Sequence, residues 1–328
     1  MRYVSLCVVL MLSIGLLHAQ SSFKKAFTAM GCGFEVTVVA SDQDVADAYL
    51  SSAIDNIRRI ELLISSWKAD SQTGQINSSA GIEPVAVDIE LYDLIKRSIG
   101  LSKLTNGAFD ITYASMDKIW KFDGTVTQFP ENQMISESVS RVGFQKIETN
   151  DSKHSVFLPE KGMKIGFGAI GKGYAADHTM KLLQSQGVSA GIINASGDLR
   201  TWGTQPDGKP WRIGIKNPLN NNKIFTMISL KDQALVTSGN YEKYILIDGK
   251  RYSHIIDPRT GVPSSGLTSV TIIASSAELA DALATSVFVM GKDVGLDFVN
   301  QIKGVECILV EDDGSVSYSD HVNANQIN

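Results

Sequence analysis

The sequence predicts a single α+β domain, built from a mainly antiparallel sheet with packed helices and preceded by a signal peptide. Strand-like apolar runs follow one another with only a few helical patterns between them, whereas a doubly wound fold alternates strand and helix. No linker rich in Pro, Gly or Ser divides the chain, and 43% of its residues are hydrophobic, which is enough for a sizeable core. We therefore expect a signal peptide at residues 1–19 and one domain at residues 20–328.

The N-terminus has the pattern of an export signal. Arg2 precedes an apolar stretch from Val4 to Leu17, and a small-residue cleavage site ends at Ala19. The stretch is shorter than the roughly 20 residues of a spanning helix, and Cys7 lies too early to be a lipidated first residue of the mature chain. We expect an exported, periplasmic protein that is soluble or peripherally associated with the inner membrane, with a retained N-terminal anchor as the lesser alternative.

Charge and cysteine content narrow the possible partners. The formal net charge is −5 and no basic run occurs, which argues against nucleic acid or anionic lipid as the main partner. After cleavage only Cys32 and Cys307 remain, too few for a disulfide framework or a zinc cluster. Whether these two cysteines pair is left open, and any metal is expected to have oxygen ligands.

The first half of the chain predicts one strand, two long helices and a region of short strands. Apolar residues recur at helical spacing after Asp42 and again after Asp88, and Gly107 is placed to end the second helix. In order, we predict a strand at 34–40, a helix within 41–67, a polar loop at 68–81, a helix within 88–107, and strands with turns at 143–167.

The second half predicts mostly strands, with one helix at each end of the strand region. Ser275 and Glu278 have the spacing of a capping box, and Gly291 follows the last apolar residue of the later helix. In order, we predict a helix at 172–186, strands at 190–198 and 211–218, strands and turns at 223–239, 243–258 and 269–275, a helix within 275–291, and a hairpin at 305–319.

The segment "GFGAIGKG", which begins at Gly166, has the glycine spacing of a dinucleotide-binding fingerprint. It lies mid-chain, however, and the next acidic residue on a strand, Asp198, follows Gly166 by 32 positions instead of about 20. A P-loop is also excluded, because Gly173 stands where Ser or Thr would bind magnesium. Two interpretations remain: a turn that lets a helix pack close to a strand, or a phosphate cradle at a helix N-terminus beside Lys172.

The predicted helix within 275–291 carries a single charge in its apolar part, Asp281, and Thr285 lies one turn later on the same face. A carboxylate in a buried helix is costly unless it is paired or bound to a metal. Asp281 is therefore either a structural cap or ion-pair partner, or a ligand of a hard cation such as Mg²⁺ together with Thr285.

Two further stretches hold candidate polar residues. "YSHIIDPRTGVP" places His254 and Asp257 at a strand end before a turn, where His254 is either a core histidine or a site residue. "NGAFDITYASM" leaves Asp110 between apolar runs, where it is either a cap for the next helix or part of a site.

Taken together and in order, nine segments resemble the FAD:protein FMN transferase family, also called the ApbE family. They cover roughly residues 26 to 310, and any one of them alone would be a weak signal. The segments are "MGCGFEVTV", "ISSWKADSQTGQIN", "NGAFDITYASMDKIWKF", "GFGAIGKGYAADHTMKLLQSQG", "IINASGDLRTWG", "WRIGIKNP", "ALVTSGNYEKY", "YSHIIDPRTGVP" and "ADALATSVFVMG".

The resemblance implies an ApbE-like, T-fold-related domain with a Mg²⁺-dependent activity on FAD. Such an enzyme cleaves the pyrophosphate of FAD, releases AMP, and joins FMN through a phosphoester to a Thr or Ser of an acceptor protein. The acceptors are exported or membrane-bound electron-transfer subunits. Carried over by position, Ala169, Asp281 and Thr285 would hold Mg²⁺, and His254 is our candidate general acid or base. The FAD site would contain Met30, Trp67, Ala108, Phe109, Asp110, Gly166, Lys172 and Ile255.

The sequence departs from the family pattern at the glycine segment. Gly166 stands where the family usually has an Asp that contacts FAD, and the loss of one charge-assisted hydrogen bond costs about 1.5–3 kcal/mol. Trp67 replaces the usual Tyr, but either ring can stack on a flavin or adenine. Two alternatives therefore remain: an FAD pyrophosphatase, in which water replaces the acceptor hydroxyl, and a non-catalytic periplasmic flavin-binding protein.

Overall fold

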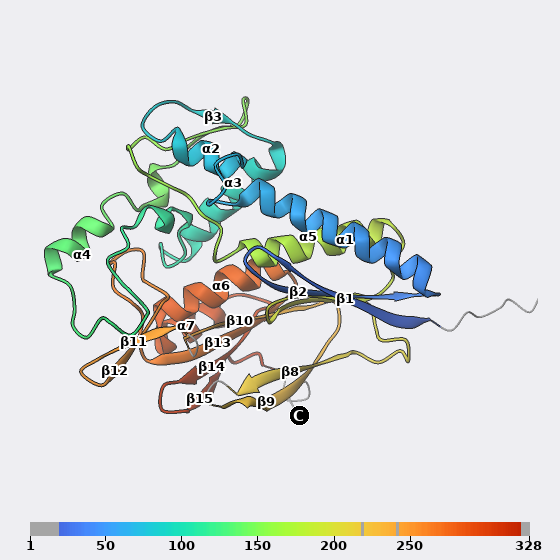
Figure 1. Ribbon diagram of the computed structural model, residues 1–328. Helices are drawn as coiled ribbons and strands as arrows, with labels where there is room; N and C mark the ends of the chain where they lie inside the picture. The colour runs from blue at the N-terminus through green and yellow to red at the C-terminus, as the bar shows by residue number, and fades with distance from the viewer. Residues whose placement is uncertain (1–19, 218–219, 241–242, 323–328) are drawn as a thin grey trace, which may run out of the picture.

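An eight-stranded sheet forms the centre of the molecule in the computed structural model, which describes residues 20–217, 220–240 and 243–322 (Figure 1). The predicted signal peptide at 1–19 lies outside the described residues. Every pairing between described strands is antiparallel, which confirms the predicted α+β class. The order across the sheet is β1 (Ser21–Ala29), β2 (Cys32–Ala40), β6 (Gly191–Ala195), β7 (Asp198–Trp202), β10 (Ala234–Gly239), β13 (Leu267–Ala274), β14 (Glu306–Glu311) and β15 (Val316–Tyr318).

Helices cover one face of this sheet and a hairpin covers part of the other (Figure 1). The helices are α1 (Gln43–Ile64), α5 (Gly171–Ser185), α6 (Ala277–Met290) and α7 (Lys292–Asn300). Their apolar faces and the facing strand residues form the largest core cluster, which includes Leu50, Trp202 and Phe288. The hairpin of β8 (Trp211–Asn217) and β9 (Asn220–Leu230) packs on the opposite face through a smaller cluster around Leu235.

A second packed region lies beyond the ends of α1 and α5 (Figure 1). It has its own core, in which Leu91, Ile95, Ile111 and Ile165 are fully or almost fully buried. It contains α2 (Gln72–Ser78), β3 (Val85–Ala86), α3 (Ile89–Leu104), η1 (Ile111–Ser115), η2 (Phe144–Lys146), β4 (Glu148–Asn150) and β5 (Ser155–Phe157). A separate small cluster joins α4 (Asn132–Ser138) to the hairpin of β11 (Tyr244–Ile247) and β12 (Lys250–Ser253).

Several sequence-based boundaries were wrong. The predicted loop at 68–81 contains α2, because the Ser71 hydroxyl accepts a hydrogen bond from the Gly74 N–H and caps a short helix. Ser276, rather than Ser275, caps α6. The segment at 163–167 is not a strand, and β1, β7, α4 and α7 were not predicted.

Among the described residues Cys32 and Cys307 are both free thiols, half-buried at Cys32 and buried at Cys307. Among the described helices none is both long and apolar enough to cross a membrane.

Candidate active site

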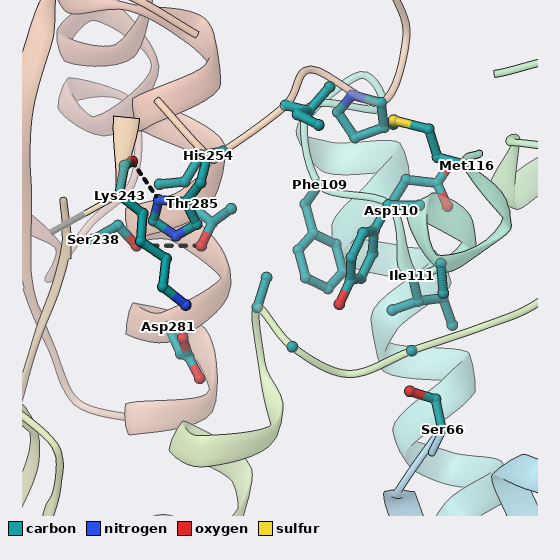
Figure 2. A pocket seen from close by; sticks show the side chains of 18 of the residues that line it. Ser66, Phe109, Asp110, Ile111, Met116, Ser238, Lys243, His254, Asp281 and Thr285 are labelled. Atoms are coloured by element: carbon teal, nitrogen blue, oxygen red, sulfur yellow. Dashed lines mark hydrogen bonds between the residues drawn. The ribbon is translucent and has the colours of Figure 1, made fainter. Parts of the chain in front are cut away.

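A cavity of about 740 Å³ lies where the second packed region meets the ends of α5 and α6, a size typical of small-molecule sites. One wall carries Phe109, Asp110 and Met116, and the opposite wall carries Asp281, Thr285 and His254 (Figure 2). The cavity brings together all but one of the predicted site residues: Trp67, Ala108, Phe109, Asp110, Gly166, Ala169, Lys172, His254, Ile255, Asp281 and Thr285.

Met30 is the predicted residue that does not line the cavity. It lies in the turn between β1 and β2 with a positive φ of 52°, and its side chain packs against both main core clusters. A Cβ at Gly171 would lie 3.4 Å from the Met30 Cε. The structure therefore places Met30 behind the glycine turn, where it supports the start of α5.

Asp110 has a structural role that the sequence offered as one alternative. One carboxylate oxygen accepts hydrogen bonds from the backbone N–H and the hydroxyl of Thr112, at 2.7 and 2.6 Å, and thereby caps η1. The other accepts from the Phe144 N–H at 2.8 Å. Burial raises the pKa of Asp110, and the bonds from Thr112 and Phe144 oppose this rise. Its carboxylate thus holds the cavity wall in shape.

The start of α5 is surrounded by carboxylates. The Lys172 ammonium forms an ion pair with Asp198 on β7, and the Gly173 N–H donates to Asp281 Oδ2 at 3.0 Å. The interpretation of this turn as a free phosphate cradle is therefore incomplete, because two of its donors already engage carboxylates. The Asp281 carboxylate also accepts a hydrogen bond from the first turn of α5, a position that the positive end of the helix dipole favours.

The charges at this end of the cavity do not balance. Asp198 and Asp281 are each only 3% exposed, and one lysine faces both. Burial raises the pKa of Asp281 to about 7, with the charge of Asp198 adding to the rise and Lys172 opposing it. Burial lowers the pKa of Lys172, but the charges of Asp198 and Asp281 outweigh this effect and raise it, so the lysine stays charged. A second cation would relieve the excess negative charge.

Oxygen atoms suited to a hard cation surround this position. Thr285 lies one turn after Asp281 on α6, and its hydroxyl is 3.2 Å from that of Ser238 on β10. Ala169 lines the cavity just before α5. Over the described residues no group of three or more His, Cys, Asp or Glu side chains could hold a metal. A cation here would therefore use one carboxylate with hydroxyl and carbonyl oxygens, which fits Mg²⁺.

The glycines of the turn are explained by close packing. A Cβ at Gly173 would collide with the Ala277 carbonyl and lie 2.8 Å from the Glu278 N, at the first turn of α6. A Cβ at Gly171 would lie 2.9 Å from Ile64 Cδ1 on α1. The predicted close approach is therefore confirmed, but the partners of α5 are two helices rather than a strand.

His254 lines the cavity opposite Phe109 (Figure 2). Its Nδ1 lies 3.2 Å from the Lys243 carbonyl oxygen, which can only accept a hydrogen bond. Nδ1 is therefore the protonated nitrogen, and Nε2 carries the lone pair in the neutral ring. This tautomer suits a general base.

Sequence reasoning missed several residues of the cavity. It also missed Asp198, which pairs with Lys172 but does not itself line the cavity; the polar strand end in "INASGD" was a signal that could have identified it. Tyr113, Ser238 and Lys243 also line the cavity, but no local pattern distinguishes them from ordinary helix, strand or loop residues. At the mouth, Trp67 is 83% exposed, and the Lys118 ammonium lies 5.0 Å from its ring centroid.

Two relatives show which proteins this chain resembles in sequence. A FAD:protein FMN transferase of Klebsiella pneumoniae (strain 342) is 31% identical over 291 residues, which cover 87% of this chain and 83% of the relative. A FAD:protein FMN transferase of Escherichia coli (strain K12) is 31% identical over 258 residues, 77% of this chain and 73% of the relative.

Solved structures give the same result. The ApbE protein of Thermotoga maritima is 34% identical with a TM-score of 0.82, covering 92% of this chain and 97% of that one. The flavin transferase ApbE from Vibrio cholerae is 26% identical with a TM-score of 0.80, covering 92% and 98%. Residues 30–309 match the sequence model of the ApbE family. The chain therefore belongs to the ApbE family.

Proposed function

We propose that this protein is a Mg²⁺-dependent FAD:protein FMN transferase. The carrying observation is that one cavity unites Asp281 and Lys172 at the start of α5 with an open side and an exposed aromatic ring. A dinucleotide needs room for two ring systems, a cationic environment for its pyrophosphate, and an open side for the acceptor protein. The relatives named above carry this activity in their names.

The Ala169 carbonyl, the Asp281 carboxylate and the Thr285 hydroxyl would hold the Mg²⁺ ion. When bound, the ion supplies positive charge that stabilises the pyrophosphate and the AMP leaving group. The donor chemistry supports this assignment, because all three groups offer oxygen and two buried carboxylates, Asp198 and Asp281, face the same lysine, Lys172.

The remaining steps belong to the residues of the chain. Trp67 would stack on a ring of FAD at the mouth, and Lys172, positioned by Asp198, would add charge beside the phosphates. The acceptor Thr or Ser hydroxyl would attack the phosphorus of the FMN half, its bond to the AMP oxygen would break, and AMP would leave. His254 Nε2 would take the hydroxyl proton, since Nδ1 is held by the Lys243 carbonyl.

The protein is expected to act after export, on an exported or membrane-bound electron-transfer subunit that carries the target Thr or Ser. The sequence pattern at residues 1–19 supports export. The acceptor hydroxyl must enter the cavity from its open side, where Trp67 lies.

The experiment is a flavinylation assay with FAD, Mg²⁺ and a candidate acceptor from the same genome. A transferase produces flavin fluorescence on the acceptor in a denaturing gel, together with one AMP per attached FMN. Free FMN and AMP in the absence of acceptor would indicate a pyrophosphatase instead. Intact bound FAD under all conditions would identify a non-catalytic flavin-binding protein and contradict the proposal.

A further inference from the structure

Hydrogen bonds fix η1 against the segment that leads into the glycine turn. The Gly166 N–H donates to the Ile111 carbonyl at 2.8 Å. The Ser115 hydroxyl donates to the Lys164 carbonyl at 2.8 Å and accepts from the Lys164 N–H at 2.7 Å. Because these bonds hold both ends of η1, the residues between them have a defined position over the turn.

Tyr113 is the residue of η1 whose hydroxyl reaches this turn. A Cβ at Gly168 would collide with the Tyr113 hydroxyl, and a Cβ at Gly166 would lie 3.6 Å from it and 3.1 Å from the Ala114 Cβ. The hydroxyl therefore occupies the space beside the two glycines. The residue as a whole is 39% exposed and lines the cavity, so its ring faces the ligand space.

The surroundings make the Tyr113 hydroxyl a hydrogen-bond donor. Burial raises the pKa of Tyr113, the negative charge of Asp281 adds to the rise, and the backbone N–H of Gly168 opposes it. The hydroxyl is therefore neutral at physiological pH. A neutral phenol hydroxyl beside the cavity can donate its hydrogen to an acceptor there.

We propose that the Tyr113 hydroxyl is a specificity-determining contact that donates a hydrogen bond to a non-bridging pyrophosphate oxygen of the bound dinucleotide. Two other donors of this turn, Lys172 and the Gly173 N–H, already engage Asp198 and Asp281. A pyrophosphate needs further donors at this end of the cavity, and a neutral phenol supplies one without changing the charge balance. This inference rests on the proposed function, since it assigns the phosphate end of the ligand to the turn.

The test compares FAD with riboflavin, which lacks the pyrophosphate and the adenosine of FAD. Tyr113→Phe keeps the ring and removes only the hydroxyl. We expect Tyr113→Phe to weaken FAD binding about ten-fold, the loss of one hydrogen bond, in a fluorescence titration without acceptor. The affinity for riboflavin should change by less than about two-fold, because riboflavin has no phosphate oxygen that could accept the lost hydrogen bond.

Tyr92→Phe is the matched control for removing a tyrosine hydroxyl. The Tyr92 hydroxyl donates to Asp151 at 2.5 Å, and neither residue lines the cavity. This variant should lower the melting temperature somewhat and leave the affinity for FAD unchanged.

Gly168→Ala tests the same hydroxyl by displacement. The added methyl group would collide with the hydroxyl in the wild-type chain, but in the Tyr113→Phe background it would meet only the ring carbon Cζ, at 3.5 Å. We therefore expect Gly168→Ala alone to reproduce the selective loss of FAD binding and to add little to Tyr113→Phe, a non-additive pair.

The outcomes separate this proposal from the proposed function. A selective, non-additive loss of FAD binding supports the role of Tyr113. Unchanged FAD affinity in Tyr113→Phe, or equal loss of FAD and riboflavin, overturns that role, the second result because it indicates that the hydroxyl only shapes the turn. A wild-type chain that binds neither flavin contradicts the proposed function itself.

Discussion

Helix α5 carries two groups of charged side chains that are organised in opposite ways. The cavity cluster, at its first turn, consists of Lys172 with Asp198 and Asp281. The helix-face cluster consists of Tyr174, Asp177 and His178 with the groups that they meet on neighbouring elements. In the helix-face cluster, Arg200 Nε lies 2.9 Å from Asp177 Oδ1, and Arg59 makes two hydrogen bonds to Glu90 at 2.6 and 3.0 Å.

The difference lies in charge balance. In the helix-face cluster each of the two carboxylates, Asp177 and Glu90, has its own guanidinium, and Tyr174 also donates to Glu90 at 2.6 Å. In the cavity cluster two buried carboxylates share one lysine. Carboxylates that each have their own guanidinium stabilise the packing of a helix. Carboxylates that share one lysine beside a cavity can instead bind a cationic ligand. On this difference in charge balance we base the proposal that the first turn is the functional end of α5.

Asp281→Asn should produce the largest effect. The amide oxygen can still accept from Gly173, but the charge that would hold Mg²⁺ is gone, so flavinylation should fall by about 10³-fold or more. The melting temperature should stay the same or rise, because an unbalanced buried charge is removed. Flavinylation rates and thermal melts measure both. Full activity in this variant would show that the cavity cluster does not bind the ion.

Asp177→Asn should have the opposite profile. It leaves the Arg200 guanidinium, which is 8% exposed, without its ionic partner. We expect the free energy of unfolding to fall by about 3–5 kcal/mol, with the activity per folded molecule retained. Denaturant unfolding measures the loss, and Asp207→Asn, which removes the partner of Lys209 in an exposed pair, serves as the control. A stable but inactive Asp177→Asn protein would break the distinction between the two clusters.

Added Mg²⁺ should stabilise the wild-type protein against heat. The same measurement on variants of the two clusters should show which cluster binds the ion. At an ion concentration of 100 times the Kd, binding to the folded state alone contributes about 2.7 kcal/mol. Differential scanning fluorimetry should show the shift in the wild type and in Asp177→Asn, and removal by a chelator should reverse it. The shift should be absent in Asp281→Asn. Equal shifts in all three proteins would place the ion elsewhere.

Glu90→Gln should give the smallest effect and a defined pH dependence. Burial alone would raise the pKa of Glu90, but hydrogen bonds from Arg59 and Tyr174 outweigh it and hold the pKa below its ordinary value of 4.5. Such a group stabilises the folded state above its unfolded pKa, and this contribution is lost as the pH falls through the folded pKa. The variant should be less stable by at most about 1 kcal/mol at pH 7, and the difference should disappear in denaturant melts at acidic pH.

The elements with regularly spaced apolar residues could be predicted from the sequence. Helix α1 has apolar residues at helical spacing after a capping Asp42, whose carboxylate accepts from the Val45 N–H at 2.9 Å, and it was found with nearly its observed bounds. Helix α2 was missed, because its short polar sequence shows no apolar stripe. Its cap, Ser71, could be recognised only in the folded structure. Strand β1 was missed because it is an edge strand with mostly exposed residues.

The site was predictable where a buried charge contradicts its apolar surroundings. Asp281 stood out for this reason, and the structure places it beside the start of α5. The partnership of Lys172 with Asp198 could not be predicted from local sequence, because the two residues meet only when β7 packs beside α5. The position of the Tyr113 hydroxyl likewise depends on tertiary hydrogen bonds between η1 and the segment at Lys164.

The contact of Asp281 with α5 also determines when the ligand site can form. Asp281 lies 108 residues after Gly173, the residue whose N–H it accepts, so this contact closes a long loop and contributes to a high contact order. During synthesis, which starts at the N-terminus, α1 and the early strands can form first. The cavity is complete only after α6 has packed against α5. If the proposed function holds, the flavin site is complete only when this late segment has packed against α5.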